Sequence, residues 1–117
     1  MMKTLRLSVL GTVQGVLFRK FIEENANRIG VRGFVRNLDD GRVEVVIEGV
    51  DEKVMEMLEV CKRGNAHSRV REVQVQEIPN QGFEGFKIMN GEIGFIMLAY
   101  SVRWVLNFFG SGIMWVF

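Results

Sequence analysis

A short segment of this 117-residue chain combines glycine, apolar residues and arginine in a pattern suited to binding an anion: residues 13–19 read VQGVLFR. The segment joins a predicted strand to a predicted helix. At a helix N-terminus the backbone N–H groups are unpaired and the helix dipole contributes partial positive charge. Gly15 permits backbone turns that direct several N–H groups at one anion, and Arg19 can bind phosphate oxygens through its planar guanidinium. These residues predict a site for one phosphoryl group, and an ordinary strand–helix connection with a surface arginine is the alternative.

Other residues capable of chemistry are better explained by structure. Cys61 lies on the inner stripe of a predicted helix, which is typical of a small core residue. His67 lies in a polar connection, and the acidic pair Asp39–Asp40 fits a turn. Because the chain has one cysteine and one histidine, we expect no internal disulfide, no metal site and no cofactor.

Hydrophobic periodicity predicts the elements that position the segment. Apolar residues recur every second position in the strands and with helical spacing in the helices, and Gly30 and Gly64 end the two helices. The predicted elements are a strand at 5–9, a helix at 18–29, two strands joined by a tight turn at 31–37 and 43–47, a helix capped by Asp51, a strand at 73–75 closed by Pro79, and a short strand at 86–88. This order, β-α-β-β-α-β with a short fifth strand, predicts a ferredoxin-like α+β sandwich: an antiparallel sheet with two helices on one face. The fold alone identifies no function, because it carries many.

The charge and the strand residues argue against two classes of partner. The net charge of +1 provides no bulk attraction for nucleic acid or an anionic membrane. An RNA-recognition module shares the fold, but the first strand carries Leu5, Leu7 and Val9 where such a module needs aromatic residues for base stacking. The N-terminus has no long apolar run, and a chain without disulfides is typical of the cytoplasm, which is the expected location.

Two segments resemble the signatures of the acylphosphatase family. Residues 11–19 (GTVQGVLFR) resemble the first signature, and residues 33–37 (GFVRN), followed by Gly41, Val43 and Gly49, resemble the second. The resemblance spans about residues 3–88 and implies the ferredoxin-like fold. It also implies an enzyme, a hydrolase that cleaves the carboxyl–phosphate bond of small acyl phosphates to carboxylate and phosphate without a metal.

The resemblance also implies roles for individual residues. Asn37 would hold the attacking water, and the Arg19 guanidinium would bind the phosphate of the substrate. The phosphate would also be bound by the backbone amides of five consecutive residues: Gly15, Val16, Leu17, Phe18 and Arg19. An acyl phosphate has a good leaving group, and its hydrolysis passes through a loose transition state with charge on the equatorial oxygens, which fixed N–H dipoles and one arginine can stabilise.

Two alternative functions stay open from the sequence. The first alternative is a stand-alone relative of the acylphosphatase-like domain of hydrogenase-maturation proteins, with carbamoyl phosphate as its substrate. A ferredoxin-like module that binds without turnover is the other alternative, although Arg19 and Asn37 are both present.

The composition changes near residue 92. Residues 1–92 form the predicted acylphosphatase-like domain, and residues 93–117 are mostly apolar, with Arg103 near their middle. As a helix these 25 residues would reach roughly 37 Å, compared with about 30 Å for a hydrocarbon core. Three interpretations stay open for this extension: a segment that associates with a membrane, a segment that packs on the domain or mediates self-association, and an adventitious extension.

Overall fold

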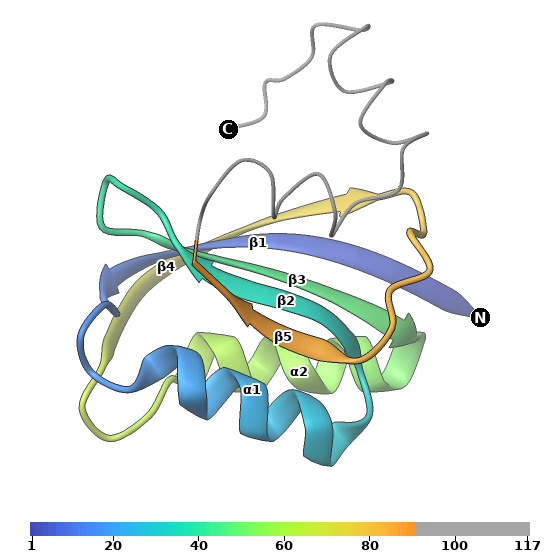
Figure 1. The fold of residues 1–117 in the computed structure, drawn as a ribbon, viewed down its shortest axis with the longest axis horizontal. Helices are drawn as coiled ribbons and strands as arrows, with labels where there is room; N and C mark the ends of the chain where they lie inside the picture. The colour runs from blue at the N-terminus through green and yellow to red at the C-terminus, as the bar shows by residue number, and fades with distance from the viewer. Residues whose placement is uncertain (91–117) are drawn as a thin grey trace, which may run out of the picture.

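A computed structural model describes residues 1–90, in which seven elements follow the predicted order (Figure 1). The elements are β1 (Met2–Thr12), α1 (Phe18–Ile29), β2 (Arg32–Asn37), β3 (Val43–Val50), α2 (Asp51–Arg63), β4 (Arg69–Ile78) and β5 (Phe86–Met89). The first strand is longer than its apolar alternation indicated, and the first helix begins at Phe18, so the connection between them is reduced to residues 13–17.

The five strands form one sheet in the order β4-β1-β3-β2-β5. Neighbouring strands are antiparallel except at one edge, where β5 runs parallel to β2 with Ile88 opposite Val35. The predicted fold class is confirmed, but the sheet is mixed rather than wholly antiparallel. The reason is the connection at residues 79–85: it crosses from one edge of the sheet to the other and returns the chain in the direction of β2.

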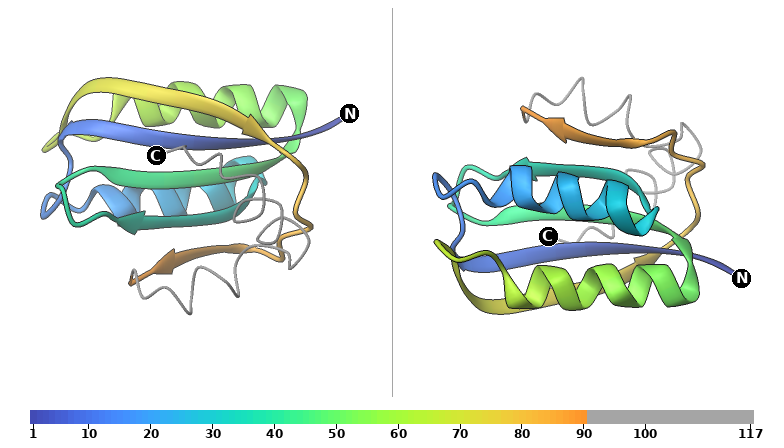
Figure 2. Two further views of the ribbon diagram at one scale, coloured as in Figure 1. Left: turned by 90° about the horizontal axis from the view of Figure 1, so that it is seen from above. Right: turned by 90° about the horizontal axis from the view of Figure 1, so that it is seen from below.

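Both helices cover the same face of the sheet (Figure 2), and the apolar core lies between the two layers. The inner face of α1 is buried through Phe18, Ile22, Ala26 and Ile29. The inner face of α2 is buried through Val54, Met57, Leu58, Val60 and Cys61. Burial of these side chains against the sheet is the main force that holds the helices in place.

The ends of the helices agree with the predictions in all but one respect. Gly30 ends α1 with a φ of 95°, and its N–H donates to the carbonyl of Ala26. The prediction that Asp51 caps α2 is wrong: Val50 occupies the cap position, and Asp51 is the first helical residue, with no side-chain capping bond. An acidic residue in the first turn is still favoured there by the helix dipole.

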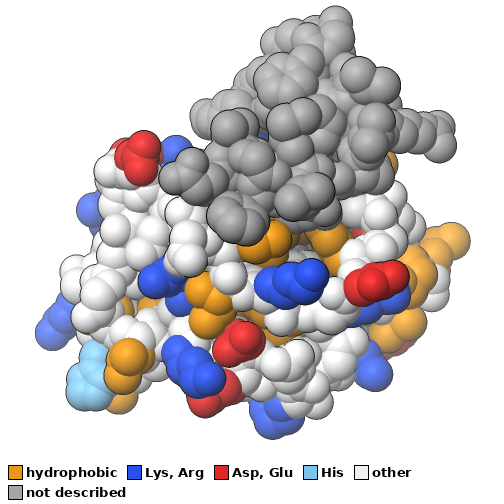
Figure 3. Space-filling view, in the orientation of Figure 1, with side chains coloured by type: hydrophobic (Ala, Val, Ile, Leu, Met, Phe, Trp, Pro, Cys, Tyr) orange, Lys and Arg blue, Asp and Glu red, His pale blue; other side chains and the backbone are white. Residues whose placement is uncertain are grey.

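On the face shown in Figure 3, cationic and anionic side chains are interspersed rather than gathered in one basic patch. No helix within residues 1–90 is long and apolar enough to span a membrane. Residues 93–117, and with them the three interpretations of the extension and the division at residue 92, lie outside the described residues and stay predictions.

Candidate active site

The connection between β1 and α1 leaves the helix N-terminus open to a ligand. Gly15 has a φ of 74°, and nothing lies within 4 Å of the position that a Cβ there would occupy, so glycine is required for the backbone turn rather than for space. Leu17 occupies the cap position of α1 in a left-handed conformation and makes no side-chain capping bond. The first turn contains no acidic residue. The N–H groups of this turn therefore face the connection without a side-chain partner of their own, as an anion site requires.

A cavity of about 290 Å³ lies against this connection. The residues that line it come from the connection, the start of α1 and the ends of β2 and β5: Val13, Gly15, Leu17, Phe18, Arg19, Lys20, Asn37 and Ile88. The structure thus brings together Gly15, Leu17, Phe18, Arg19 and Asn37, which the sequence identified from two separate motifs. Val16 is the exception. It does not line the cavity, and its carbonyl is bound from outside by Asn65.

Arg19 extends from the first turn of α1 towards the end of β5. Its Nη1 lies 3.4 Å from the carbonyl oxygen of Met89, a long hydrogen bond. No acidic side chain among residues 1–90 forms an ion pair with Arg19. Arg19 itself lines the cavity, so its charge is available to an anion bound there.

Asn37 is the last residue of β2 and lines the same cavity as the loop residues. Its Oδ1 is buried and has no hydrogen-bond partner within the described part of the chain. A buried polar atom without a partner is costly and is commonly satisfied by water or a ligand. Asn37 can therefore accept a hydrogen bond from a water molecule in the cavity.

Two side chains that the sequence analysis did not assign hold the loop in place. The Nε2 of Gln14 donates to the carbonyls of Leu38 and Arg42, at 2.8 and 2.9 Å, and so connects the loop to the turn that follows β2. The Nδ2 of Asn65 donates to the carbonyl of Val16 at 2.9 Å. Gln14 could have been noted as a polar residue within the first motif, whereas no pattern in the sequence relates Asn65 to a residue 49 positions away.

The reactive residues that the sequence analysis set aside lie away from this cavity. Cys61 is fully buried on α2, and burial raises the pKa of its thiol to about 12, so the thiol stays protonated. The backbone N–H of Arg42 donates to Asp40, and this bond, with that from the Arg42 side chain, lowers the pKa of the Asp40 carboxyl. Residues 1–90 contain no group of three or more side chains suited to hold a metal ion.

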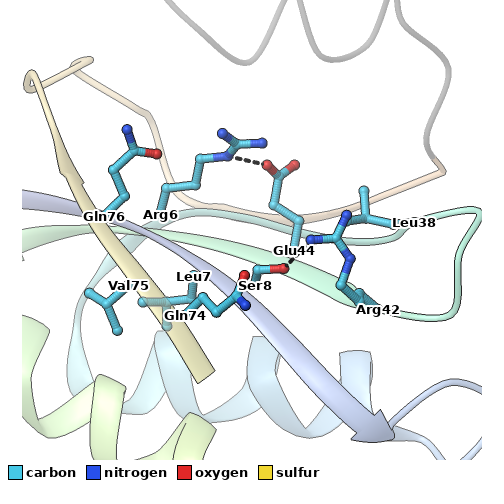
Figure 4. Close-up of a pocket in the computed structure, with 9 residues that line it drawn as sticks. All are labelled: Arg6, Leu7, Ser8, Leu38, Arg42, Glu44, Gln74, Val75 and Gln76. Atoms are coloured by element: carbon cyan, nitrogen blue, oxygen red, sulfur yellow. Dashed lines mark hydrogen bonds and ion pairs between the residues drawn. The ribbon is translucent and has the colours of Figure 1, made fainter. Parts of the chain in front are cut away.

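A second cavity, of about 210 Å³, lies on β1, β3 and β4 and the turn between β2 and β3 (Figure 4). Its charged side chains are already paired. The buried Glu44 accepts hydrogen bonds from Arg6 at 2.5 Å and from Arg36 at 2.6 Å, and Arg42 donates to Ser8 at 2.8 Å. The charged side chains of this cavity are thus engaged in contacts within the fold, so the cavity beside the loop is the better candidate for an anion site.

The chain is similar to known proteins both in sequence and in structure. The sequence model of the acylphosphatase family matches residues 5–88. A protein of Rubrobacter xylanophilus named "Acylphosphatase" is 48% identical over 87 residues, which are 74% of this chain and 79% of that protein. The crystal structure of acylphosphatase from Bacillus subtilis matches with a TM-score of 0.73 and 37% identity, over 76% of this chain and 99% of that one. The crystal structure of HypF from T. kodakarensis matches with a TM-score of 0.66 and 36% identity, over 77% of this chain but 12% of that one.

Proposed function

Because the chain belongs to the acylphosphatase family, and is a hydrolase that acts on small acyl phosphates, we propose a role in that reaction for each polar group of the cavity beside the β1–α1 loop. The observation that carries the proposal is the meeting, in one cavity, of an uncapped helix N-terminus, an arginine with no ion-pair partner among residues 1–90, and a buried amide oxygen without a partner. The first two groups suit a phosphate, and the third suits a water molecule.

The phosphate is bound by the loop amides and by Arg19. The N–H groups of Gly15, Leu17 and Phe18 belong to residues that line the cavity, and the helix dipole adds positive potential at the same place. Arg19 contributes a full charge and a planar pair of donors. The hydrolysis of an acyl phosphate concentrates charge on the equatorial phosphate oxygens in the transition state, so donors that are fixed before the reaction lower the barrier.

Asn37 orients the attacking water. Its Oδ1 accepts a hydrogen bond from the water. A lone pair of the water oxygen then points away from Asn37 and towards the phosphorus. A carboxamide cannot take up a proton at neutral pH, so Asn37 is not a general base. The proton of the water goes to a phosphate oxygen or to solvent, and the carboxylate leaves without protonation because it is already a weak base.

Turnover in the presence of a chelator tests the proposal. The purified protein is expected to hydrolyse benzoyl phosphate at the same rate with and without EDTA, because every catalytic group comes from the chain. Absence of turnover, or turnover that EDTA abolishes, would contradict it. Carbamoyl phosphate is assayed in parallel, because the sequence leaves the hydrogenase-maturation alternative open. A strong preference for carbamoyl phosphate would favour that alternative.

A further inference from the structure

We propose that Asn65 is a positioning residue for the reaction: its side chain fixes the peptide between Val16 and Leu17 so that the N–H of Leu17 points into the cavity. The proposal rests on the proposed function, because it assigns to that N–H a share in binding the phosphate. Asn65 itself touches no substrate. It acts from the connection between α2 and β4, which lies beside the β1–α1 loop at the same end of the sheet (Figure 1).

Asn65 contacts the backbone of the β1–α1 loop directly. The Nδ2 of Asn65 donates to the carbonyl oxygen of Val16 at 2.9 Å, and the contact is partly buried. The donor is held in place by its own turn: the N–H of Asn65 donates to the Oγ of Ser68 at 3.0 Å, and the N–H of Ser68 donates to the carbonyl of Asn65 at 3.2 Å. Asn65 is therefore a fixed donor that meets the loop from outside the cavity.

The backbone of Leu17 adopts an unfavourable conformation. Its φ of 61° and ψ of 22° are left-handed, and among residues 1–90 it is the one residue other than glycine with a positive φ. Residues with a Cβ disfavour this conformation, so neighbouring contacts must maintain it. The side chain of Leu17 is 73% exposed and provides little packing. The backbone is held instead on both sides, by the Asn65–Val16 bond and by the bond from the N–H of Phe21 to the Leu17 carbonyl, at 3.1 Å.

Peptide geometry relates the Asn65 contact to the conformation of Leu17. In a planar trans peptide the carbonyl and the following N–H point in opposite directions. Because Asn65 binds the Val16 carbonyl outside the cavity, the N–H of Leu17 is directed inward, where Leu17 lines the wall. Without Asn65 the peptide is free to rotate, which would relieve the strain at Leu17 and turn the Val16 oxygen towards the phosphate. Asn65 therefore orients the amide dipole before the substrate arrives.

Asn65→Ala tests the proposal, with Asn25→Ala as a matched control. The Nδ2 of Asn25 also donates to a backbone carbonyl at 2.9 Å, that of Phe21, but within α1 and away from the loop. Isothermal titration with inorganic phosphate, with kinetics on benzoyl phosphate, measures the effect. Asn65→Ala is expected to weaken phosphate binding and to lower kcat/KM by roughly tenfold, less than the 10²–10³ for the outright loss of a transition-state donor. Asn25→Ala is expected to leave phosphate binding and kcat/KM near the wild-type values, while it lowers the melting temperature about as much as Asn65→Ala does.

Two further measurements keep the outcome unambiguous. In a Leu17→Gly background the left-handed conformation is no longer strained, so Asn65→Ala is expected to cost less there than in the wild type. An equal cost in both backgrounds, or phosphate binding by Asn65→Ala equal to that by Asn25→Ala, overturns the role of Asn65. If the alanine variant does not fold, Asn65→Ser, whose side chain is shorter, takes its place. If neither the wild type nor Asn25→Ala binds phosphate, the proposed function itself is wrong.

Discussion

Arg19 and Asn37 occupy one cavity but are suited to different tasks, and single substitutions separate these tasks. Arg19 carries a charge in the first turn of α1, whereas Asn37 presents a neutral, buried oxygen at the end of β2. A charge contributes to the binding of phosphate in the ground state as well as in the transition state. An oxygen that orients water contributes when the reaction takes place and adds little to the binding of the product.

Arg19→Gln is expected to weaken the binding of inorganic phosphate and to lower kcat together, because it removes both the charge and the planar pair of donors. Arg19→Lys is expected to recover little of the loss, since an ammonium group keeps the charge but not the planar geometry. Inhibition constants for phosphate and steady-state kinetics on benzoyl phosphate provide the measurement. Near-normal activity of Arg19→Lys would show that the charge alone is sufficient.

Asn37→Ala is expected to leave phosphate binding nearly unchanged while kcat falls by roughly 10²–10³, the range for the loss of one well-placed polar group. The same two assays measure it, so the ratio of the two effects can be compared directly with that for Arg19→Gln. If Asn37→Ala weakened phosphate binding as strongly as Arg19→Gln, Asn37 would be a phosphate ligand and its assignment to water would be wrong.

The connection between β4 and β5 supports the site from the far end of the sheet through Glu48. This carboxylate on β3 is 1% exposed and accepts hydrogen bonds from the hydroxyl of Thr4 and from the backbone N–H groups of Gln81, Gly82 and Phe83. It thereby fixes the crossing that places β5 beside β2. Through that strand, Ile88 reaches the cavity and the carbonyl of Met89 reaches Arg19.

The stability of the protein is expected to fall in acid because of Glu48. Burial acts to raise the pKa of this carboxyl, but the hydrogen bonds from Thr4 and from residues 81–83 outweigh burial, so its pKa lies below the ordinary value of 4.5. A carboxyl group whose pKa is lower in the folded than in the unfolded state stabilises the fold. This stabilisation is fully present at pH values above the pKa of the unfolded state. This contribution is lost as the pH falls below 4.5 and through the folded-state pKa.

Urea denaturation between neutral pH and pH 3 measures this dependence. Glu48→Gln is expected to lower the free energy of unfolding at neutral pH by about 1–3 kcal/mol, because an amide satisfies the N–H groups less well. It is also expected to flatten the dependence on pH. Glu77→Gln, at an exposed position of β4, is the control and is expected to change neither quantity appreciably. A Glu48→Gln curve parallel to that of the wild type would show that other carboxyl groups cause the acid sensitivity.

Taken together, the groups assigned to catalysis lie within residues 1–90, so the apolar extension is not required by the proposed reaction. Truncation after Asn90 is therefore expected to preserve kcat/KM on benzoyl phosphate. It is also expected to reduce aggregation, since the removed segment is mostly apolar and apolar surface promotes association. Kinetics and light scattering on the truncated and full chains measure the two effects. A truncated protein that folds but has lost turnover would show that residues 91–117 contribute to the site.

The sequence by itself determined the features that depend on neighbouring residues. Periodicity located the helices and strands because the burial of one face repeats along each element, and the loop at residues 13–19 was identified from glycine and arginine next to a helix start. The cap of α2 was misplaced by one residue, because Val50 and Asp51 differ in backbone conformation, which side-chain type indicates only weakly.

The tertiary structure decided the features that depend on residues far apart in the chain. It placed Asn37 and Arg19 in the lining of one cavity, paired β5 in parallel with β2, and brought Asn65 to the carbonyl of Val16. A pattern of apolar residues specifies which face of an element is buried but not which element packs beside it. The packing of the whole core and the path of the connections determine which elements lie side by side. Only that arrangement shows which side chains donate to the loop and orient it.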